Sequence, residues 1–387
     1  MSERSLAHVE QIVDIQPIEG ADKIEVATVL GWKVVVAKSD NFKVGDKIVY
    51  IEIDSKVPER PEFEFLRDRK FRVRTIKLRG QYSQGLIVPL SILGKGNYNV
   101  GDDVTQKLGV TYYVPEDNIR KAAKPPKHLR YQSMAARHKD LFKRQPFRWL
   151  MKREWGRAFL FLFFGKKKDK PKAFPSKFPF VHKTDETRIE ALPHLLGYPN
   201  PLVVTEKLDG TSSTYILERL KGKDKYEFWV LSRNIRQFNE DQDCYHDYNI
   251  YWAMAKKYDI EAHLREFLEK NPGYDYVCVQ GESVGTVQGN PLKLKEDDLY
   301  IFNFVTPDGR ISSLEGKKIV ESWGMKWVPI LDEAFIMPTD MEEFKQMATA
   351  KSVVNPTVMR EGIVLRDPKT DLSFKNVSRE YLLKHEG

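Results

Sequence analysis

The first third of the chain consists of short runs of strand-forming residues separated by turn-forming residues, and this pattern restricts its fold most. Val, Ile and Tyr are frequent in the runs, whereas Gly, Asp, Asn and Pro lie between them. The pattern predicts an all-β region from residue 5 to about residue 112. Its strands are expected at Ile24–Val29, Trp32–Ala37, Lys47–Ile53, Phe71–Leu78 and Gly85–Leu90.

The number and spacing of these runs favour a small barrel. Two similar phrases, Lys43–Asp46 and Asn99–Asp102, each end in Gly-Asp. A strand-like run follows each of them directly. Five or six strands in about 110 residues suit an OB-fold. Some OB-folds bind nucleic acid and others are spacers, so the fold alone assigns no function.

A strongly basic segment follows the β region. Between Lys121 and Lys172 there are 17 Lys/Arg and 3 Asp/Glu, although the whole chain has a net charge of only +8. Residues 124–127 (Lys-Pro-Pro-Lys) indicate a linker, and Phe147–Arg153 with Trp155–Phe164 predicts a basic amphipathic helix. Three interpretations remain open: a solvated interdomain helix, a contact to phosphates of a nucleic acid, or a membrane-surface segment.

From about residue 181 onward the pattern is mixed α and β. Strands are predicted at Leu202–Thr205, Thr214–Leu217, Glu227–Leu231, Tyr276–Gln280, Leu299–Val305 and Gly362–Arg366. Helices are predicted at Ile260–Lys270, Leu314–Trp323 and Met341–Ala350. The chain is therefore predicted to be α+β, with domain boundaries that give segments 1–115, 116–180 and 181–387.

The composition indicates an intracellular protein. Cys244 and Cys278 belong to no CxxC pair or Cys/His cluster, so neither disulfides nor structural zinc is expected. No signal peptide is visible at the start, and the longest apolar stretch, Ala158–Phe164, is too short to span a bilayer. We expect a cytoplasmic or nuclear protein with no membrane partner.

The phrase Thr205–Thr211 carries the strongest signal for chemistry. It places Lys207, Asp209 and Gly210 directly after an apolar run. Alone it is weak, because a chain of this length would contain Lys-x-Asp-Gly by accident roughly one time in ten. Asp-Gly is also a common hairpin turn.

Further short phrases follow this one in a fixed order. Glu361 begins Glu-Gly-Ile-Val-Leu-Arg, and Lys375 lies 14 residues after it. The whole series comprises Thr205–Thr211, Ser232-Arg233-Asn234, Gln280-Gly281-Glu282, Phe302, Glu361–Arg366 and Ser373-Phe374-Lys375. Each residue has an ordinary explanation: Phe302 as core, the carboxylates as solvent-facing strand residues, Arg188, Arg233 and Lys375 as surface residues. All of those explanations would have to be correct at once if this ordered series had no shared function.

This ordered set resembles the covalent nucleotidyltransferases, which comprise polynucleotide ligases and mRNA capping enzymes. The resemblance covers roughly residues 183–380 and is closest to RNA ligases with an N-terminal OB domain. Lys183–Arg188 and Gln288-Gly289-Asn290 also look like that group. It implies an adenylyltransferase domain of antiparallel sheets with helices in 181–387. The implied activity joins 3′-hydroxyl and 5′-phosphate RNA ends through lysyl-AMP and adenylylated 5′-phosphate intermediates.

The resemblance also implies roles for individual residues. Lys207 would be the nucleophile that takes AMP from ATP, and Asp209, Glu282 and Glu361 would hold a hydrated Mg²⁺ or Mn²⁺. The remaining ATP contacts would be Arg188, Glu206, Arg233, Glu282, Phe302 and Lys375. The expected partner is RNA, including a nicked duplex or an RNA/DNA hybrid, and no obligate protein partner is evident.

Elementary chemistry gives an independent reason for this residue set. A lysine amine attacks phosphorus only when it is neutral, and fewer than about one in a hundred is neutral near pH 7.5. Neighbouring cations favour the neutral amine and also stabilise the charge of a departing pyrophosphate. The site is therefore expected to lower the pKa of Lys207.

Two other functions remain open. An RNA-capping guanylyltransferase would use GTP, and a non-catalytic binder would need neither the lysine nor the three carboxylates. Only 12 residues follow Lys375 in this sequence, so the second OB domain that DNA ligases and capping enzymes usually carry is not expected here. Val377 occupies a position that is often basic in related enzymes, which questions how the α-phosphate is held.

Overall fold

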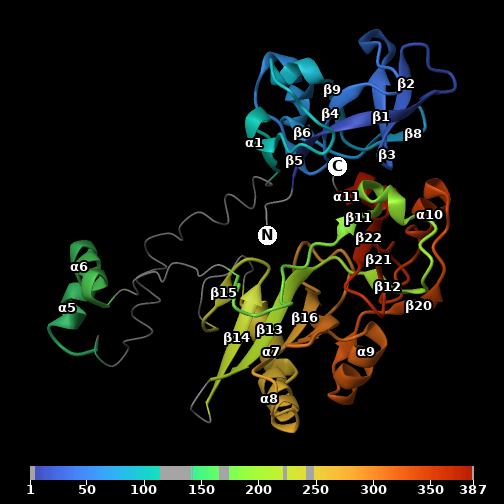
Figure 1. Ribbon diagram of the computed structural model, residues 1–387. Coiled ribbons are helices and arrows are strands. Elements are labelled where there is room, and N and C mark those ends of the chain that lie inside the picture. Colours follow the sequence, from blue (N-terminus) through green and yellow to red (C-terminus); the bar gives the residue numbers. More distant parts are fainter. Residues whose placement is uncertain are drawn as a thin grey trace.

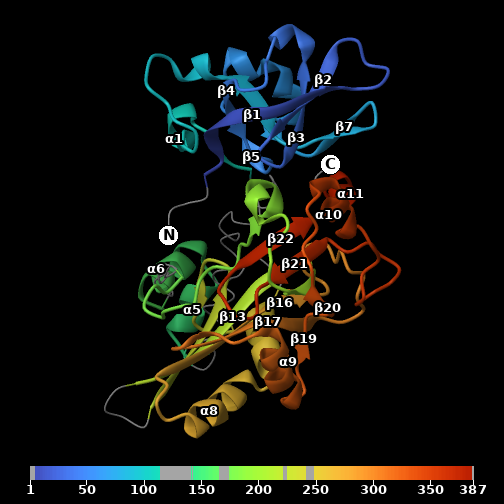
Figure 2. The same cartoon turned by 45° about the vertical axis from the view of Figure 1, so that its right-hand side comes forward.

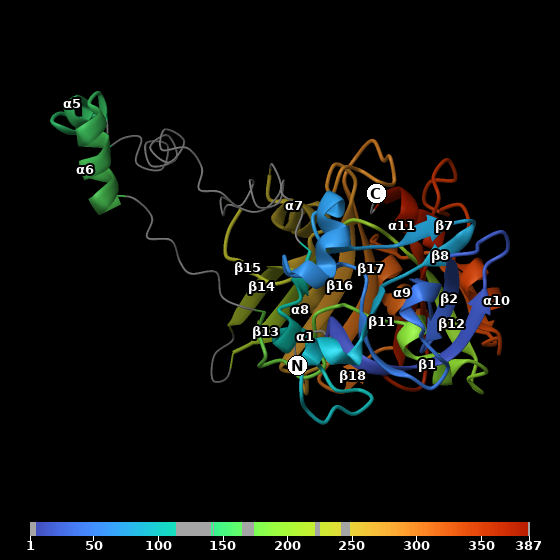
Figure 3. The same ribbon diagram turned by 90° about the horizontal axis from the view of Figure 1, so that it is seen from above.

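The computed structural model describes residues 5–113, 141, 143–164, 174–220, 225–240 and 248–385. Figure 1 shows an N-terminal β domain above a larger C-terminal domain, with helices α5 and α6 standing apart from both. The same separation is visible from above in Figure 3.

The N-terminal domain is built on one strongly bent sheet with the strand order β3-β2-β1-β4-β9. The first half of β1 pairs with β4 and its second half with β2, and a bulge lies between Ile12 and Asp14. A bulge of this kind bends a strand and allows one strand to serve both sides of a barrel. The strands are β1 (Ala7–Pro17), β2 (Ile24–Val29), β3 (Trp32–Ala37), β4 (Lys47–Ile51) and β9 (Leu86–Pro89).

Smaller elements complete this domain. A three-stranded sheet has the order β10-β5-β6, and β7 pairs with β8. These strands are β5 (Ser55–Lys56), β6 (Arg72–Val73), β7 (Ile76–Leu78), β8 (Gln81–Ser83) and β10 (Thr111–Tyr112). The helices are α1 (Thr105–Leu108) and the 3-10 turns η1 (Lys38–Asp40), η2 (Pro61–Arg69) and η3 (Leu90–Leu93).

The predicted strands of this domain were mostly correct, and β2 and β3 match to the residue. The predicted strand Phe71–Leu78 is wrong as a single element. It is divided into β6, which pairs with β5, and β7, which pairs with β8. The chain changes sheets between Val73 and Ile76, so a two-residue side-chain period does not run through the segment. The longest strand, β1, was not among the predicted runs.

The described residues of the C-terminal domain form two sheets, as the prediction of antiparallel sheets with helices requires. The first has the order β11-β22-β21-β12-β20, and the second runs β15-β14-β13-β16-β17-β18, with β19 beside β17. All these pairings are antiparallel except β11–β22 and β17–β19. The strands of the first sheet are β11 (Thr187–Arg188), β12 (Leu202–Lys207), β20 (Ile330–Phe335), β21 (Gly362–Arg366) and β22 (Ser373–Val377).

Helices cover the outer faces of the two sheets (Figure 2). The second sheet contributes Val277, Val279 and Phe304 to the largest apolar cluster, where helix residues Met254, Leu264 and Val320 join them. Its strands are β13 (Thr211–Arg219), β14 (Tyr226–Ser232), β15 (Arg236–Gln237), β16 (Tyr276–Val284), β17 (Asp298–Thr306), β18 (Gly309–Arg310) and β19 (Lys326–Trp327). The helices of the domain are η4 (Ile189–Ala191), η5 (Pro193–Leu195), α7 (Ile250–Lys257), α8 (Ile260–Lys270), α9 (Ser313–Ser322), α10 (Met341–Met347) and α11 (Arg379–His385). Helix α8 has the predicted bounds.

The two domains share an apolar contact near the end of the chain. Val377 and Leu382 are buried in the same cluster as Trp32 and Tyr50 of the N-terminal domain. The amide of Gly31 donates to the carbonyl of Glu190 at 2.7 Å. A Cβ atom at position 31 would lie 2.9 Å from the Glu190 Cα, so this close backbone approach requires glycine.

The predicted basic amphipathic helix is present as two helices, α5 (Phe147–Met151) and α6 (Glu154–Phe164). Gly156 allows them to pack closely, because a Cβ atom there would lie 2.2 Å from the Leu150 carbonyl oxygen. Within the described residues, neither these nor any other helix combines the length and apolarity that crossing a membrane would require.

Candidate active site

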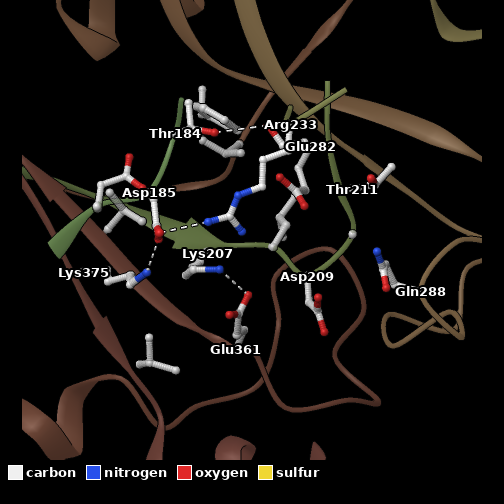
Figure 4. Close-up of a pocket in the computed structure, with 18 of the residues that line it drawn as sticks. Thr184, Asp185, Lys207, Asp209, Thr211, Arg233, Glu282, Gln288, Glu361 and Lys375 are labelled. Atoms are coloured by element: carbon white, nitrogen blue, oxygen red, sulfur yellow. Dashed lines mark hydrogen bonds and ion pairs between the residues drawn. The ribbon is translucent and has the colours of Figure 1, made fainter. Parts of the chain in front are cut away.

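A pocket of about 630 Å³ lies between the two sheets of the C-terminal domain. Strands β12, β21 and β22 form one wall, β13 and β16 form another, and helix α11 adds Tyr381 and His385. Asp54 and Tyr112 of the N-terminal domain also line it. The pocket therefore receives residues from both domains, and Figure 4 shows its polar side chains converging on Lys207.

Lys207 is the last residue of β12, and its side chain lines the pocket. Its register partner on β21 is Gly362, so Glu361 lies directly beside it. The Lys207 Nζ donates a hydrogen bond to Glu361 Oε2 at 2.6 Å (Figure 4).

Asp209 and Glu282 reach the same region from neighbouring elements. Asp209 lies in the β12–β13 connection, and Glu282 on β16 is the register partner of Ser212 on β13. A Cβ atom at Gly210 would lie 2.3 Å from the Ser283 carbonyl oxygen, so this turn can approach β16 only with glycine. Three carboxylates from three segments thus surround one lysine.

The protein groups alone hold Lys207 in its charged form. Burial opposes the charge, but Glu361 and Glu282 outweigh burial and raise the pKa of Lys207 above its ordinary value. Burial also raises the pKa of Glu282 to about 8, and the negative charges of Glu361 and Asp209 add to that rise against the opposing effect of Lys207. Without a further cation, the site acts against the neutral amine that nucleophilic attack needs.

This arrangement fits a hard divalent cation. Oxygen donors from carboxylates are the ligands that Mg²⁺ and Mn²⁺ prefer, and a cation among them would offset their mutual repulsion. Among the described residues, no three His, Cys, Asp or Glu side chains are placed to ligate one ion together. The expectation of a hydrated ion, contacted partly through its waters, is compatible with that spacing.

Two of the predicted phosphate-contacting cations share one carboxylate partner. The Asp185 carboxylate accepts from Arg233 Nη2 at 2.9 Å and from Lys375 Nζ at 2.9 Å. Arg188, the register partner of Lys375, donates to Asp54 of the N-terminal domain at 3.2 Å. Burial, followed by the nearby Arg188 charge, lowers the pKa of Lys375.

Glu206 and Phe302 lie on the two walls of the pocket, on β12 and β17. Glu206 is buried, its Oε2 accepts from the Val353 amide at 2.8 Å, and burial raises its pKa. Phe302 is half-buried, and the Arg366 guanidinium carbon lies 5.7 Å from its ring centre.

All nine residues singled out in the sequence line this one pocket. The sequence assigned no role to Asp185, although it lies in the quoted phrase Lys183–Arg188. It missed Tyr381, whose hydroxyl donates to Asp209 Oδ2 at 2.6 Å, and Asp54, which pairs with Arg188. Neither has a local signal, because each comes from an element whose position depends on tertiary packing.

Val377, the departure at an often basic position, is buried in the interdomain apolar cluster. Its carbonyl accepts a hydrogen bond at 2.9 Å from Lys345 Nζ, which also pairs with Glu190 at 2.6 Å. Burial outweighs Glu190 and lowers the pKa of Lys345 to about 8. The end of β22 therefore contributes to the contact between the N-terminal and C-terminal domains.

Comparison with known families agrees with this architecture. Residues 6–90 match an OB-fold domain model and residues 200–384 match the RNA ligase model. Among curated proteins, the phenylalanine–tRNA ligase beta subunit of Prochlorococcus marinus is 31% identical over 99 residues. That alignment covers 26% of this chain and spans only 11% of the length of the relative.

Solved structures match the entire chain. An apo variant of the Naegleria gruberi RNA ligase is 28% identical, with a TM-score of 0.73 and coverage of 100% of this chain and 99% of that one. A variant of the same ligase with ATP and Mn is 28% identical, with a TM-score of 0.72 and coverage of 99% and 100%. An OB-fold domain thus precedes an RNA ligase domain in this chain, and the same two-domain arrangement is found in the Naegleria gruberi RNA ligase.

Proposed function

We infer that this ligase joins 3′-hydroxyl and 5′-phosphate RNA ends in a nicked duplex, with Lys207 as the nucleophile. The observation that carries the inference is the Lys207 amine at 2.6 Å from Glu361, with Asp209 and Glu282 beside it in a large polar pocket. A structural lysine needs one partner, whereas three surrounding carboxylates supply a site for a second cation.

The proposed reaction has three steps. The neutral Lys207 amine attacks the α-phosphorus of ATP, a P–N bond forms, and pyrophosphate leaves. The RNA 5′-phosphate then attacks that phosphorus, so that AMP moves to the RNA and Lys207 is released. Finally the 3′-hydroxyl loses its proton, attacks the adenylylated 5′-phosphate and expels AMP.

The residues around Lys207 have distinct parts in this proposal. Asp209, Glu282 and Glu361 would hold Mg²⁺ or Mn²⁺, which supplies positive charge that favours the neutral amine and stabilises the α-phosphate. The phosphate contacts would be Arg188, Arg233 and Lys375, with Asp185 giving up its two ion pairs as the triphosphate enters. Phe302 would stack on adenine, and Glu206 would lie beside the base edge.

The C-terminal domain would carry out the chemistry, and the N-terminal domain would help to position the RNA ends. We assign the OB-fold domain to 1–115, the basic linker to 116–180 and the adenylyltransferase domain to 181–387. Sealing needs a polynucleotide whose two ends are held in line, and the OB domain lies next to the pocket through Asp54 and Tyr112.

The first test is transfer of radiolabel to the protein. With Mg²⁺ or Mn²⁺, ATP labelled at the α-phosphate should label the chain on Lys207, and GTP labelled in the same way should not. Labelling by GTP alone would favour a capping enzyme. RNA binding without any labelling would favour a non-catalytic binder.

The second test concerns the polynucleotide. The enzyme should seal a nicked RNA duplex and a nicked RNA/DNA hybrid faster than single-stranded RNA. Equal rates on single strands would contradict the nick preference and leave the ligase assignment intact.

A further inference from the structure

Helices α5 and α6 carry a surface that the ligase reaction does not use. Trp149, Trp155, Phe159 and Phe163 are exposed by 46%, 55%, 48% and 69%. Trp155, Phe159 and Phe163 follow each other at four-residue intervals and so share one face of α6. Trp149 of α5 extends that row, because its ring centre lies 5.8 Å from that of Trp155. We name these four residues the aromatic stripe.

The stripe is held in place by the packing of the two helices. Gly156 allows α6 to approach the Leu150 carbonyl closely. The rings of Phe159 and Phe163 lie 5.1 Å apart, and the Arg153 guanidinium lies 4.4 Å from the Trp149 ring centre. The exposed rings therefore form one continuous surface instead of scattered apolar residues, and such surfaces mark interaction sites.

Charge is concentrated at one end of this surface. Residues 143–164 contain six Lys/Arg and a single acidic residue, Glu154. All six basic residues precede Ala158, and Ala158–Phe164 contains no charged residue. Arg144, Arg148, Lys152 and Arg153 are exposed.

The end of the stripe that holds Phe159 and Phe163 has no charged residue around it in the sequence, and this distinguishes two possible ligands. A single-stranded RNA presents phosphates and bases in alternation, and its binding sites place basic and aromatic side chains together along a groove. A bilayer surface presents anionic headgroups and acyl chains in separate layers. A helix that lies in this interface buries one apolar face about 5–10 Å deep, and the aromatic stripe provides such a face on α6.

We propose that α5 and α6 bind this RNA ligase to the surface of a membrane that contains anionic lipids. The aromatic stripe enters the boundary between headgroups and acyl chains, where Trp is favoured, and the basic residues that precede Ala158 contact the headgroups. The helices lie on the bilayer and do not cross it. This inference goes beyond the ligase function and replaces the expectation from sequence of no membrane partner.

The test is flotation of the full-length protein with vesicles at about 0.15 M salt. Vesicles of phosphatidylcholine with phosphatidylserine should carry the protein upward, and vesicles of phosphatidylcholine alone should not. The double variant Phe159→Glu/Phe163→Glu should reduce the bound fraction at least about tenfold. The matched control is Val44→Glu/Phe65→Glu, which places two charges at positions of the N-terminal domain that are 61% and 64% exposed. It should bind like the unaltered protein.

Three results would overturn the proposal: no flotation with anionic vesicles, equal binding to both kinds of vesicle, or equal losses in the two double variants. An RNA surface would appear as a loss of RNA affinity in Phe159→Glu/Phe163→Glu without any vesicle binding, which also overturns it. Labelling of each variant with ATP shows that its ligase domain is folded, so a failure of the membrane proposal is distinguishable from a failure of the ligase assignment.

Discussion

The Tyr381 hydroxyl donates a hydrogen bond to Asp209 Oδ2 at 2.6 Å, and this contact joins helix α11 to the carboxylates around Lys207. The same helix contacts the N-terminal domain. Leu382 is buried in the cluster of Trp32 and Tyr50, and Arg379 Nε donates to Gln84 Oε1 at 3.1 Å. One short helix therefore packs on the OB domain with some residues and orients a pocket carboxylate with another.

Replacement of Tyr381 by Phe tests this positioning role. A hydrogen bond to a charged group contributes about 1.5–3 kcal/mol, so Tyr381→Phe should slow AMP transfer to the enzyme about tenfold or more. The matched control is Tyr198→Phe, which removes a 2.7 Å hydrogen bond to Asp367 away from the pocket. Single-turnover labelling rates over a series of Mg²⁺ concentrations provide the measurement. A positioning role predicts a greater Mg²⁺ requirement in Tyr381→Phe, and equal rates in the two variants would exclude it.

Replacement of the nucleophile should abolish labelling completely. Lys207→Ala removes the amine, and Lys207→Arg should fail equally because a guanidinium stays protonated. Lys326→Ala is the control, because Lys326 pairs with Asp298 and does not line the pocket. Peptide mapping of the labelled protein completes the measurement. AMP recovered on a peptide without Lys207 would show that another residue is the nucleophile.

Much of this site could be read from the sequence because the motif residues lie within strands or directly beside them. Lys207 ends β12 and Glu361 precedes β21, so each phrase contains both its strand and its functional side chain. Strands β2, β3 and β21 were also predicted to the residue, since their alternation or apolar runs are short and bounded by turns. Tyr381, Asp54 and the division between β6 and β7 could not be predicted. Each depends on which elements meet in space, and a local pattern does not encode that.

Amide replacements at the three carboxylates should separate catalysis from stability. Asp209→Asn, Glu282→Gln and Glu361→Gln should each slow labelling on the order of 100-fold or more, because the divalent cation loses a ligand or a partner for its waters. The melting temperature should not fall for Glu282→Gln, since that change removes a half-buried carboxylate whose pKa is already raised to about 8. EDTA should stop labelling of the unaltered protein. Undiminished labelling in EDTA would refute the metal role.

Removal of the N-terminal domain should affect both catalytic stages. All motif residues follow residue 181, so the sequence predicts that a chain beginning near Phe174 forms the AMP adduct and only seals poorly. The structure changes this expectation. Such a chain would expose Val377 and Leu382, remove the Asp54 partner of Arg188 and release the α11 helix that carries Tyr381. We expect both labelling and sealing to fall, and addition of the missing domain as a separate chain to restore little.

A point substitution tests the same coupling without truncation. Arg379→Ala removes hydrogen bonds to Glu342 at 2.6 and 2.9 Å and to Gln84 at 3.1 Å, and it should lower both the melting temperature and the labelling rate. Arg265→Ala, which removes an exposed ion pair with Glu261, should change neither. A truncated chain that labels at the full rate would show that the OB domain does not support the pocket.

The stability of the N-terminal domain should depend on pH through His8. This buried residue lies 2.8 Å from Glu10 and 3.6 Å from Glu52, and its ring packs edge-on against Tyr50. Burial opposes its charge, but the two glutamates outweigh burial and raise the pKa of His8 to about 9. The folded pKa exceeds the ordinary value of 6.5, so the stabilisation is complete below about pH 6.5 and is lost as the pH rises through 9.

The size of this effect follows from the pKa difference, which corresponds to about 3 kcal/mol at most. The melting temperature should therefore drop by several degrees between pH 6.5 and pH 9.5 in the unaltered protein. His8→Gln removes the titrating group and should flatten this part of the profile, while lowering stability at pH 6.5. Comparing the two proteins cancels the opposite contribution of Lys345, whose pKa is lowered to about 8 and whose charged form costs stability below that pH. Parallel profiles for the two proteins would show that His8 is not the group responsible.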